Sequence, residues 1–186
     1  YYTFGGDYEN SFPGLEGEKV GQEETITVNG SLLLYPSEGF EIIARVNYSE
    51  DDDGHYAIAL QGAEANNCFI GVAREYYCGN VQIPEEGPRL ETNYFDDPSG
   101  IQRESWRTSL TMNIDVGQNQ LTSITSYSHR DTRSIQDQTF GGTDLHPYGF
   151  RFGFITDEIG SQKDFSQEVR FASADENAFR YIVGAY

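Results

Sequence analysis

The feature that most constrains the fold of this chain is an alternation of apolar and polar side chains with a period of two residues. Over residues 104–115, Trp106, Leu110, Met112 and Ile114 share one set of alternate positions, and the other set is polar. An extended strand points successive side chains to opposite faces, so this period indicates a strand with one apolar and one polar face. No segment shows a convincing apolar stripe with the 3.6-residue period of a helix. The pattern therefore predicts an all-β fold.

The same alternation, less regular near both termini, predicts about seven strands. They cover residues 1–8, 25–35, 40–49, 104–115, 119–130, 164–173 and 178–186. The apolar positions expected on one face are Ile26, Val28, Leu32, Leu34, Ile42, Val46, Leu110, Met112, Ile114, Val169 and Phe171. The polar positions expected on the opposite face are Thr27, Asn29, Arg45, Arg107, Asn113, Glu168 and Arg170.

Short and long connections alternate between these strands. Residues 36–39, 116–118 and 174–177 are turn-forming segments that each join two strands as a hairpin. The long connections expected between the hairpins cover residues 9–22, 50–103 and 131–163. In an antiparallel up-and-down meander, this rhythm places every short turn at one edge and every long loop at the other. Outer-membrane β-barrels have this arrangement, whereas a soluble sandwich does not require it.

The composition excludes several classes of protein. Lys and Arg number 12 and Asp and Glu number 30, so the formal net charge of −18 argues against nucleic acid as a partner. No apolar run approaches the ~20 residues of a membrane-spanning helix, but barrel strands need no such run. Aromatic residues make up 14% of the chain, which is typical of a folded protein rather than a disordered acidic one.

Aromatic residues stand near the ends of several predicted strands, where barrels carry aromatic girdles at the two membrane interfaces. They are Tyr35, Phe40, Tyr48, Trp106, Tyr127, Phe165 and Tyr186. The competing interpretation is the general abundance of aromatic residues in strands. Seven strands is an odd number, whereas single-chain bacterial barrels have an even one. The first and last strands would also be left with open edges, which cannot exist in hydrocarbon. We therefore expect a sector of a larger barrel.

One hairpin, one strand and one turn carry a resemblance to a known family. Residues 164–173 read D-F-S-Q-E-V-R-F-A-S, and residues 181–186 read Y-I-V-G-A-Y. Together they resemble the F-S-Q-E hairpin of TonB-dependent outer-membrane receptors. Residues 121–127, L-T-S-I-T-S-Y, resemble the strand that precedes this hairpin in many members, and residues 34–40, L-Y-P-S-E-G-F, resemble a turn upstream.

The resemblance implies a 22-stranded barrel plugged by an N-terminal globular domain, in the outer membrane of a Gram-negative bacterium. It implies import of a scarce small-molecule ligand, such as a ferric siderophore, with energy from the TonB complex acting through the plug. Residues 1–186 match a single partial barrel segment without plug or TonB box, so this part alone is not expected to transport. The expected partners are outer-membrane lipid, the TonB complex and the small-molecule ligand.

Arginine and aromatic residues in the predicted loops are the candidate ligand contacts. Arg130 and Arg133 lie where a strand enters a long loop, and Tyr148 and Arg151 lie in an aromatic and glycine-rich segment of that loop. Arginine binds anionic groups through bidentate hydrogen bonds. The competing interpretations are ion pairs with the abundant acidic residues and packing of the aromatic rings on neighbouring segments.

The two cysteines, Cys68 and Cys78, lie ten positions apart in a polar segment. This spacing predicts one local disulfide and an oxidising compartment. Reduced surface thiols are the alternative, and a zinc site needs more ligands than His55 supplies.

Catalytic and metal-binding motifs are weak in this sequence. The run Asp51-Asp52-Asp53-Gly54-His55 begins like a calcium loop, but Gly62 occupies the position of the required Glu. A solvated acidic loop is the expected structure, with loop-bound calcium as the alternative and no other cofactor. No G-x-S-x-G, H-E-x-x-H or phosphate-loop motif is present, so we expect no enzyme. The alternative is that the chain is a secreted soluble β-sandwich, cross-linked by the disulfide, whose function is to bind carbohydrate.

Overall fold

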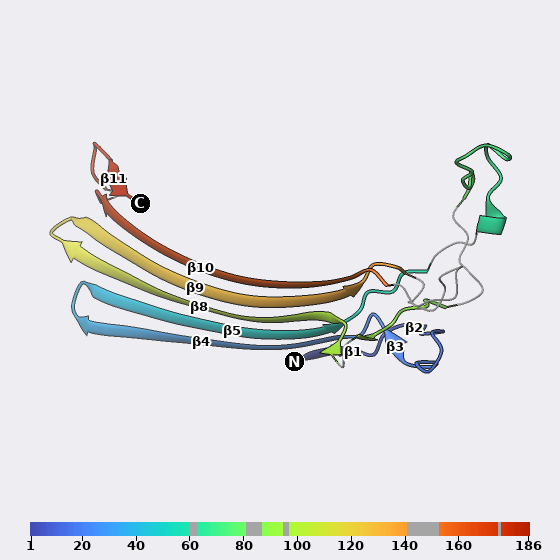
Figure 1. Ribbon diagram of the computed structural model, residues 1–186. Coiled ribbons are helices and arrows are strands. Elements are labelled where there is room, and N and C mark those ends of the chain that lie inside the picture. Colours follow the sequence, from blue (N-terminus) through green and yellow to red (C-terminus); the bar gives the residue numbers. More distant parts are fainter. Residues whose placement is uncertain (60–62, 81–86, 95–96, 141–152, 175) are drawn as a thin grey trace.

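The computed structural model describes residues 1–59, 63–80, 87–94, 97–140, 153–174 and 176–186. Its main element is a seven-stranded sheet in the order β1-β4-β5-β8-β9-β10-β11 (Figure 1). All neighbouring strands of this sheet are antiparallel, and each follows the previous one along the chain. The predicted all-β meander of about seven strands is therefore confirmed.

The strands of the main sheet differ greatly in length. They are β1 (Tyr2–Phe4), β4 (Glu23–Ser37), β5 (Phe40–Gly54), β8 (Gly100–Val116), β9 (Asn119–Asp137), β10 (Ile155–Ala172) and β11 (Ile182–Ala185). The small elements in the connections are β2 (Tyr8–Glu9), β3 (Lys19–Val20), β6 (Asn93–Tyr94), β7 (Asp97–Pro98) and the 3-10 helix η1 (Ala63–Ala65). The pairs β2-β3 and β6-β7 form two separate two-stranded sheets. Within the described residues, no helix has the length and apolar character needed to cross a membrane.

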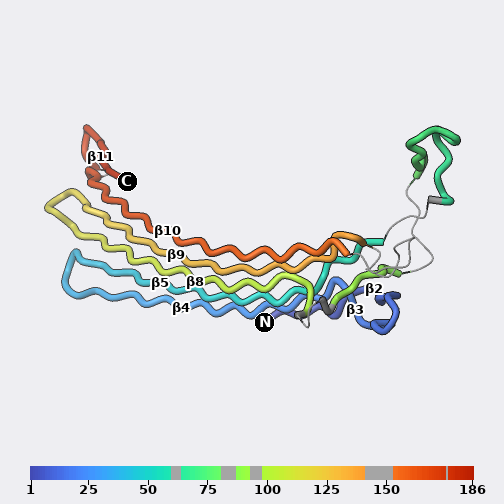
Figure 2. The backbone as a smooth tube through the Cα atoms, viewed as in Figure 1, coloured from blue at the N-terminus to red at the C-terminus, as the bar shows by residue number. Residues whose placement is uncertain are grey.

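Short turns and long connections lie at opposite ends of the long strands, as Figures 1 and 2 show. Residues 38–39, 117–118 and 173–181 connect strands at one end, which we call the turn end. Residues 5–22, 55–99 and 138–154 connect strands at the other end, the loop end. The five long strands curve together along their length and lie side by side (Figure 1).

The long strands extend farther toward the loop end than the sequence predicts. The connections expected over 50–103 and 131–163 are shorter, because β5 continues to Gly54, β8 starts at Gly100, β9 continues to Asp137 and β10 starts at Ile155. The extension of β5 is polar on both faces, and those of β8, β9 and β10 carry only isolated isoleucines such as Ile101, Ile135 and Ile159, so no regular period-two signal marks them. A β-ladder needs only backbone hydrogen bonds and suitable cross-strand pairs, which polar residues also provide.

The two terminal strands are shorter than predicted. The strand expected over 1–8 is reduced to β1 and the two residues of β2, and the strand expected over 178–186 is reduced to β11. In the turn between β4 and β5, Pro36 belongs to a register irregularity between Leu34 and Ser37. This position suits proline, which has no N–H to donate to a regular ladder.

The register of the sheet separates the side chains into two faces. Directly opposed residues of neighbouring strands point to the same face. One row consists of Leu34, Ile42, Met112, Ser123 and Val169. Extended along the strands, this register places all residues predicted to be apolar-facing on one face, which we call the apolar face. All those predicted to be polar-facing lie on the opposite, polar face.

Buried side chains gather at the loop end rather than beneath the sheet. Those that the structure describes include Asn10, Phe12, Val20, His55, Leu90, Ser99, Ile135, Gln136 and Asp137. By contrast, Val28 is 59% exposed and Leu32 is 55% exposed on the apolar face. The apolar face is therefore not covered by the described residues, although its composition is that of a buried surface.

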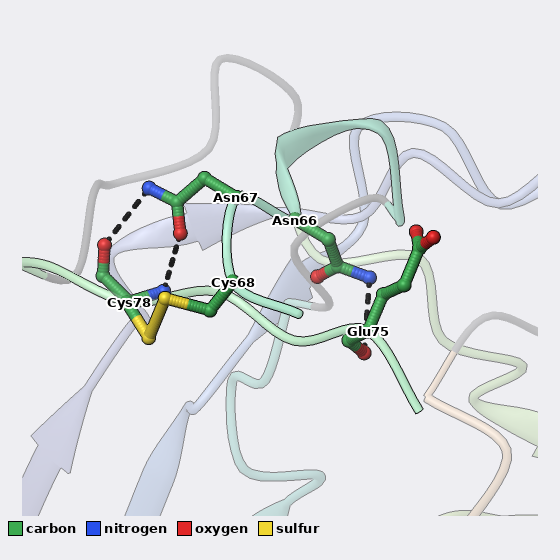
Figure 3. Close-up of a disulfide and its surroundings, with 5 residues drawn as sticks. All are labelled: Asn66, Asn67, Cys68, Glu75 and Cys78. Atoms are coloured by element: carbon green, nitrogen blue, oxygen red, sulfur yellow. Dashed lines mark hydrogen bonds between the residues drawn. A yellow bond between two sulfur atoms is a disulfide. The ribbon is translucent and has the colours of Figure 1, made fainter. Parts of the chain in front are cut away.

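The disulfide Cys68–Cys78 is present, as predicted, and its Cα atoms lie 5.8 Å apart. Figure 3 shows how Asn67 supports it: the Asn67 amide donates to the carbonyl oxygen of Cys78 at 2.9 Å and accepts from the Cys78 N–H at 2.7 Å. The amide of Asn66 donates to the carbonyl oxygen of Glu75 at 3.3 Å. These hydrogen bonds and the disulfide define a closed local loop within the β5–β8 connection.

Candidate functional site

The apolar face carries an aliphatic band bordered by aromatic residues on both sides. Toward the loop end, the border consists of Tyr48, Trp106, Tyr127 and Phe165. Trp106 lies at the centre of this border, with its ring 5.0 Å from that of Tyr127 and stacked on His129 at 6.0 Å. Toward the turn end, Phe171 lies 6.3 Å from Tyr181. Two aromatic borders around an aliphatic band are typical of a surface that crosses a bilayer.

The width of the band matches hydrocarbon. From Trp106 to Ile114, β8 rises by about 27 Å, since each of the roughly eight steps adds ~3.4 Å. A strand that crosses the hydrocarbon core uses about 9–11 residues with a tilt. Beyond the aromatic border the apolar face becomes charged, with Glu50, Asp52 and Glu104 on β5 and β8. The apolar character is thus concentrated in one segment of β4, β5, β8 and β10, although Ile26 and Ile159 lie beyond the border on the same face.

Gln167 is the most polar residue within the band. Its amide oxygen accepts a hydrogen bond from Thr125 at 2.6 Å, and its amide nitrogen donates to Ser123 at 3.0 Å. An amide in an apolar environment is costly only when its hydrogen bonds are unmade. The cross-strand pairs from β9 therefore make this glutamine compatible with the band.

The polar face carries three consecutive cross-strand rows, at the level of the aromatic border, that contain no apolar side chain. The rows are Thr27, Ser49, Ser105, Arg130 and Gln162; Asn29, Asn47, Arg107, Ser128 and Asp164; and Ser31, Arg45, Ser109, Ser126 and Ser166. We call these three rows the arginine field. Its charged members are three arginines and one aspartate.

A groove of about 580 Å³ follows the arginine field and is lined by Arg45, Arg107 and Asp164 among other residues. A smaller groove of about 210 Å³ adjoins it and adds Arg130 and Gln162. Small-ligand sites usually have volumes of about 300–1,000 Å³. The groove is therefore large enough to hold a small molecule against this face.

The arginines of the field differ from Lys19, Arg103, Arg133 and Arg170, each of which pairs with a carboxylate. Within the described residues, neither Arg45, Arg107 nor Arg130 has an acidic side chain within ion-pair distance, and all three are exposed. By contrast, Arg103 lies 3.3 Å from Asp51 on the same face. The field is thus a region of uncompensated positive charge in a chain whose net charge is −18.

The predicted ligand contacts Arg130 and Arg133 lie on opposite faces of β9, since they are three positions apart in an extended strand. Arg130 belongs to the arginine field. Arg133 makes two hydrogen bonds to the carboxylate of Asp157, at 3.1 and 3.0 Å, and these lower the pKa of that carboxyl. Tyr148 and Arg151 lie outside the described residues. For all four residues, ligand contact stays a prediction.

The sequence places Arg45 and Arg107 among the expected polar-facing residues and does not single them out as ligand contacts. Their proximity depends on the register of β5 against β8, where Asn47 opposes Arg107 and Arg45 opposes Ser109. The available signal was the expected polar face, to which both residues were assigned. The sequence pattern does not give the register between β5 and β8, and this register decides which polar residues lie next to each other.

The acidic run at the end of β5 is divided by the strand. Asp51 and Asp53 point to the polar face and Asp52 to the apolar face. Asp51 accepts a hydrogen bond from Thr25 at 2.9 Å. Burial, followed by the charges of Asp51 and Glu23, raises the pKa of Asp53. The described residues contain no group of three or more His, Cys, Asp or Glu placed to hold a metal ion.

Comparison of the chain with protein-family models, with curated proteins and with solved structures finds no match. Membership of the receptor family therefore stays a prediction based on the motifs in residues 34–40, 121–127 and 164–186.

Proposed function

We propose that this chain forms part of the β-barrel wall of a TonB-dependent outer-membrane receptor that imports a scarce ligand such as a ferric siderophore. The observation that carries the proposal is the division of the sheet into an aliphatic band with aromatic borders and an opposite polar face. The apolar face contacts lipid and the polar face lines the lumen. The plug and the TonB complex supply the energy coupling, so this segment does not transport alone.

The open edges of the sheet support a larger barrel. β11 pairs only with residues 169–172 of β10, and β1 pairs only with residues 23–25 of β4. Backbone groups in hydrocarbon need partners within the protein, so further strands must continue these ladders in a bilayer. The resemblance assigns 22 strands to the complete barrel.

The soluble sandwich is less well supported. It requires a second sheet over the apolar face, and none of the described residues forms one. Phe165, for example, is 68% exposed on this face.

Site-directed spin labelling tests the proposal in the intact polypeptide, reconstituted in lipid vesicles. Single cysteines replace residues 106–114 one at a time, and each label is exposed to membrane-soluble oxygen and to a water-soluble nickel chelate. We expect oxygen to relax the labels at even positions most strongly, because these lie on the apolar face, and the chelate to act on odd positions. Uniform access of the chelate to both sets would exclude a lipid-facing surface.

A further inference from the structure

We propose that Arg45, Arg107 and Arg130 form a binding track for a small anion with two or more carboxylate or phosphate groups. This inference rests on the proposed function, in which the polar face lines the lumen, and it names the chemical class of the ligand. The track lies within the arginine field described above.

The three arginines lie on a diagonal that leads toward the loop end. Each step moves one strand across and one row along: Arg45 is on β5, Arg107 on β8 and Arg130 on β9. Such a step corresponds to about 8 Å between Cα atoms. Flexible arginine side chains can close this distance onto a single ligand, so an anion with two charged groups can bind two neighbouring guanidinium groups at once.

The charge of the field is unusual for this chain. Among its three rows, three arginines face one aspartate, whereas the complete chain has 30 acidic and 12 basic residues. In the adjoining row of the polar face, Asp51 already pairs with Arg103, so Asp164 is the one carboxylate within the field that offsets its three guanidinium charges. Positive side chains along a channel wall favour anions.

The neutral residues of the field suit the same class of ligand. Serine, threonine, asparagine and glutamine occupy all the other positions, and their hydroxyl and amide groups can donate hydrogen bonds to anionic oxygens. The groove of about 580 Å³ fits a small molecule rather than a folded protein segment. We therefore assign the track to a small anion and treat an acidic protein segment as the competing occupant.

The test uses the intact polypeptide in lipid nanodiscs and isothermal titration calorimetry. The probes are tricarballylate, a tricarboxylate, and inorganic pyrophosphate, with sucrose as a neutral control. We expect both anions to bind, sucrose not to bind, and binding to weaken as sodium chloride rises. Arg107→Gln removes the central guanidinium and should weaken binding about tenfold or more, as expected for loss of a charge-assisted hydrogen bond.

The matched control is Lys163→Gln, because Lys163 opposes His129 on the apolar face and the variant removes one positive charge away from the track. This variant should bind both probes like the unaltered protein. The track is excluded if neither anion binds, or if the two variants lose the same affinity. If an acidic segment of the protein already occupies the arginines, neither anion will bind, and Arg107→Gln will lower the thermal stability of the protein. This result would also overturn the inference.

Failure of the track is distinguishable from failure of the barrel. If spin labels on residues 106–114 alternate between lipid and water while no anion binds, only the track is wrong. If the labels do not alternate, the lumen itself is absent and both proposals fail.

Discussion

The imidazole of His55 accepts a hydrogen bond from the main-chain N–H of Asp137, with 2.9 Å between Nε2 and N. The other ring nitrogen, Nδ1, lies 2.7 Å from the carbonyl oxygen of Tyr56 and must carry the proton. His55 directly follows β5 and Asp137 ends β9, so this bond joins two strands across the start of β8. His55 is 1% exposed. A buried histidine with both nitrogens engaged thus holds the loop end together.

Replacing this histidine should loosen the loop end. His55→Ala leaves the buried N–H of Asp137 without its acceptor, which costs about 1–3 kcal/mol, in addition to the lost ring volume. Hydrogen–deuterium exchange should speed up at residues 135–139 while residues 106–114 keep their protection. The variant His55→Gln, whose amide oxygen can replace Nε2, should recover part of the protection. Equal exchange in His55→Ala and the unaltered protein would contradict a structural role for this bond.

A positive charge on the apolar face should block membrane assembly. Leu110→Lys places an ammonium group within the aliphatic band, and such a substitution costs about 2–4 kcal/mol near the bilayer midplane. Asn113→Lys places the same group on the polar face, close to Glu41, to which Asn113 donates a hydrogen bond at 2.8 Å. If the proposed function holds, the first variant of the intact polypeptide should be lost from the outer-membrane fraction, and the second should be kept. Equal tolerance of both substitutions would contradict the assignment of the faces.

Loss of the disulfide should act locally. Cys68 and Cys78 close a loop of ten residues, for which the chain-entropy model gives about 3 kcal/mol. The hydrogen bonds that support the loop, such as those between Asn67 and Cys78, all lie within residues 66–78. Reduction should therefore make residues 66–80 sensitive to limited proteolysis and leave the long strands resistant. The double variant Cys68→Ser, Cys78→Ser should be cleaved with or without reductant, and protection of this variant would contradict the prediction.

Asp53 lies at the loop end, outside the aliphatic band, and should make the free energy of unfolding depend on pH. Burial and the nearby carboxylates raise its pKa in the folded state. The ionised carboxyl therefore destabilises the fold at neutral pH, and this cost disappears as the pH falls through the raised pKa. Asp53→Asn should raise the unfolding temperature at pH 7, with a gain that fades toward the ordinary pKa of about 3.9. The fluorescence of Trp106 reports unfolding.

The control for this titration is Asp52→Asn, which lies on the opposite face of β5. It removes the same charge from the chain without relieving the crowding around Asp53. A gain at pH 7 that is equal in both variants would show that the overall negative charge, and not the burial of Asp53, is responsible.

The two faces of the sheet were predictable because they depend on local stereochemistry. Leu110 and Asn113 lie on opposite faces of any extended strand, whatever its neighbours are. The turn at 117–118 and the short connection between β4 and β5 were likewise visible in the sequence. The extension of β5 beyond Ser49 was not, because its side chains are polar on both faces and carry no hydrophobic period.

The sequence by itself therefore determined the strand periodicity, the hairpins at the turn end and the cysteine pair, all of which depend on residues close in the chain. Only the tertiary structure decided which rows align across the sheet. Arg45, Arg107 and Arg130 come together, and Arg133 is separated from them, because the register of β5, β8 and β9 is set by backbone ladders between distant segments. The same holds for His55 and Asp137, whose contact depends on where two strands end in space.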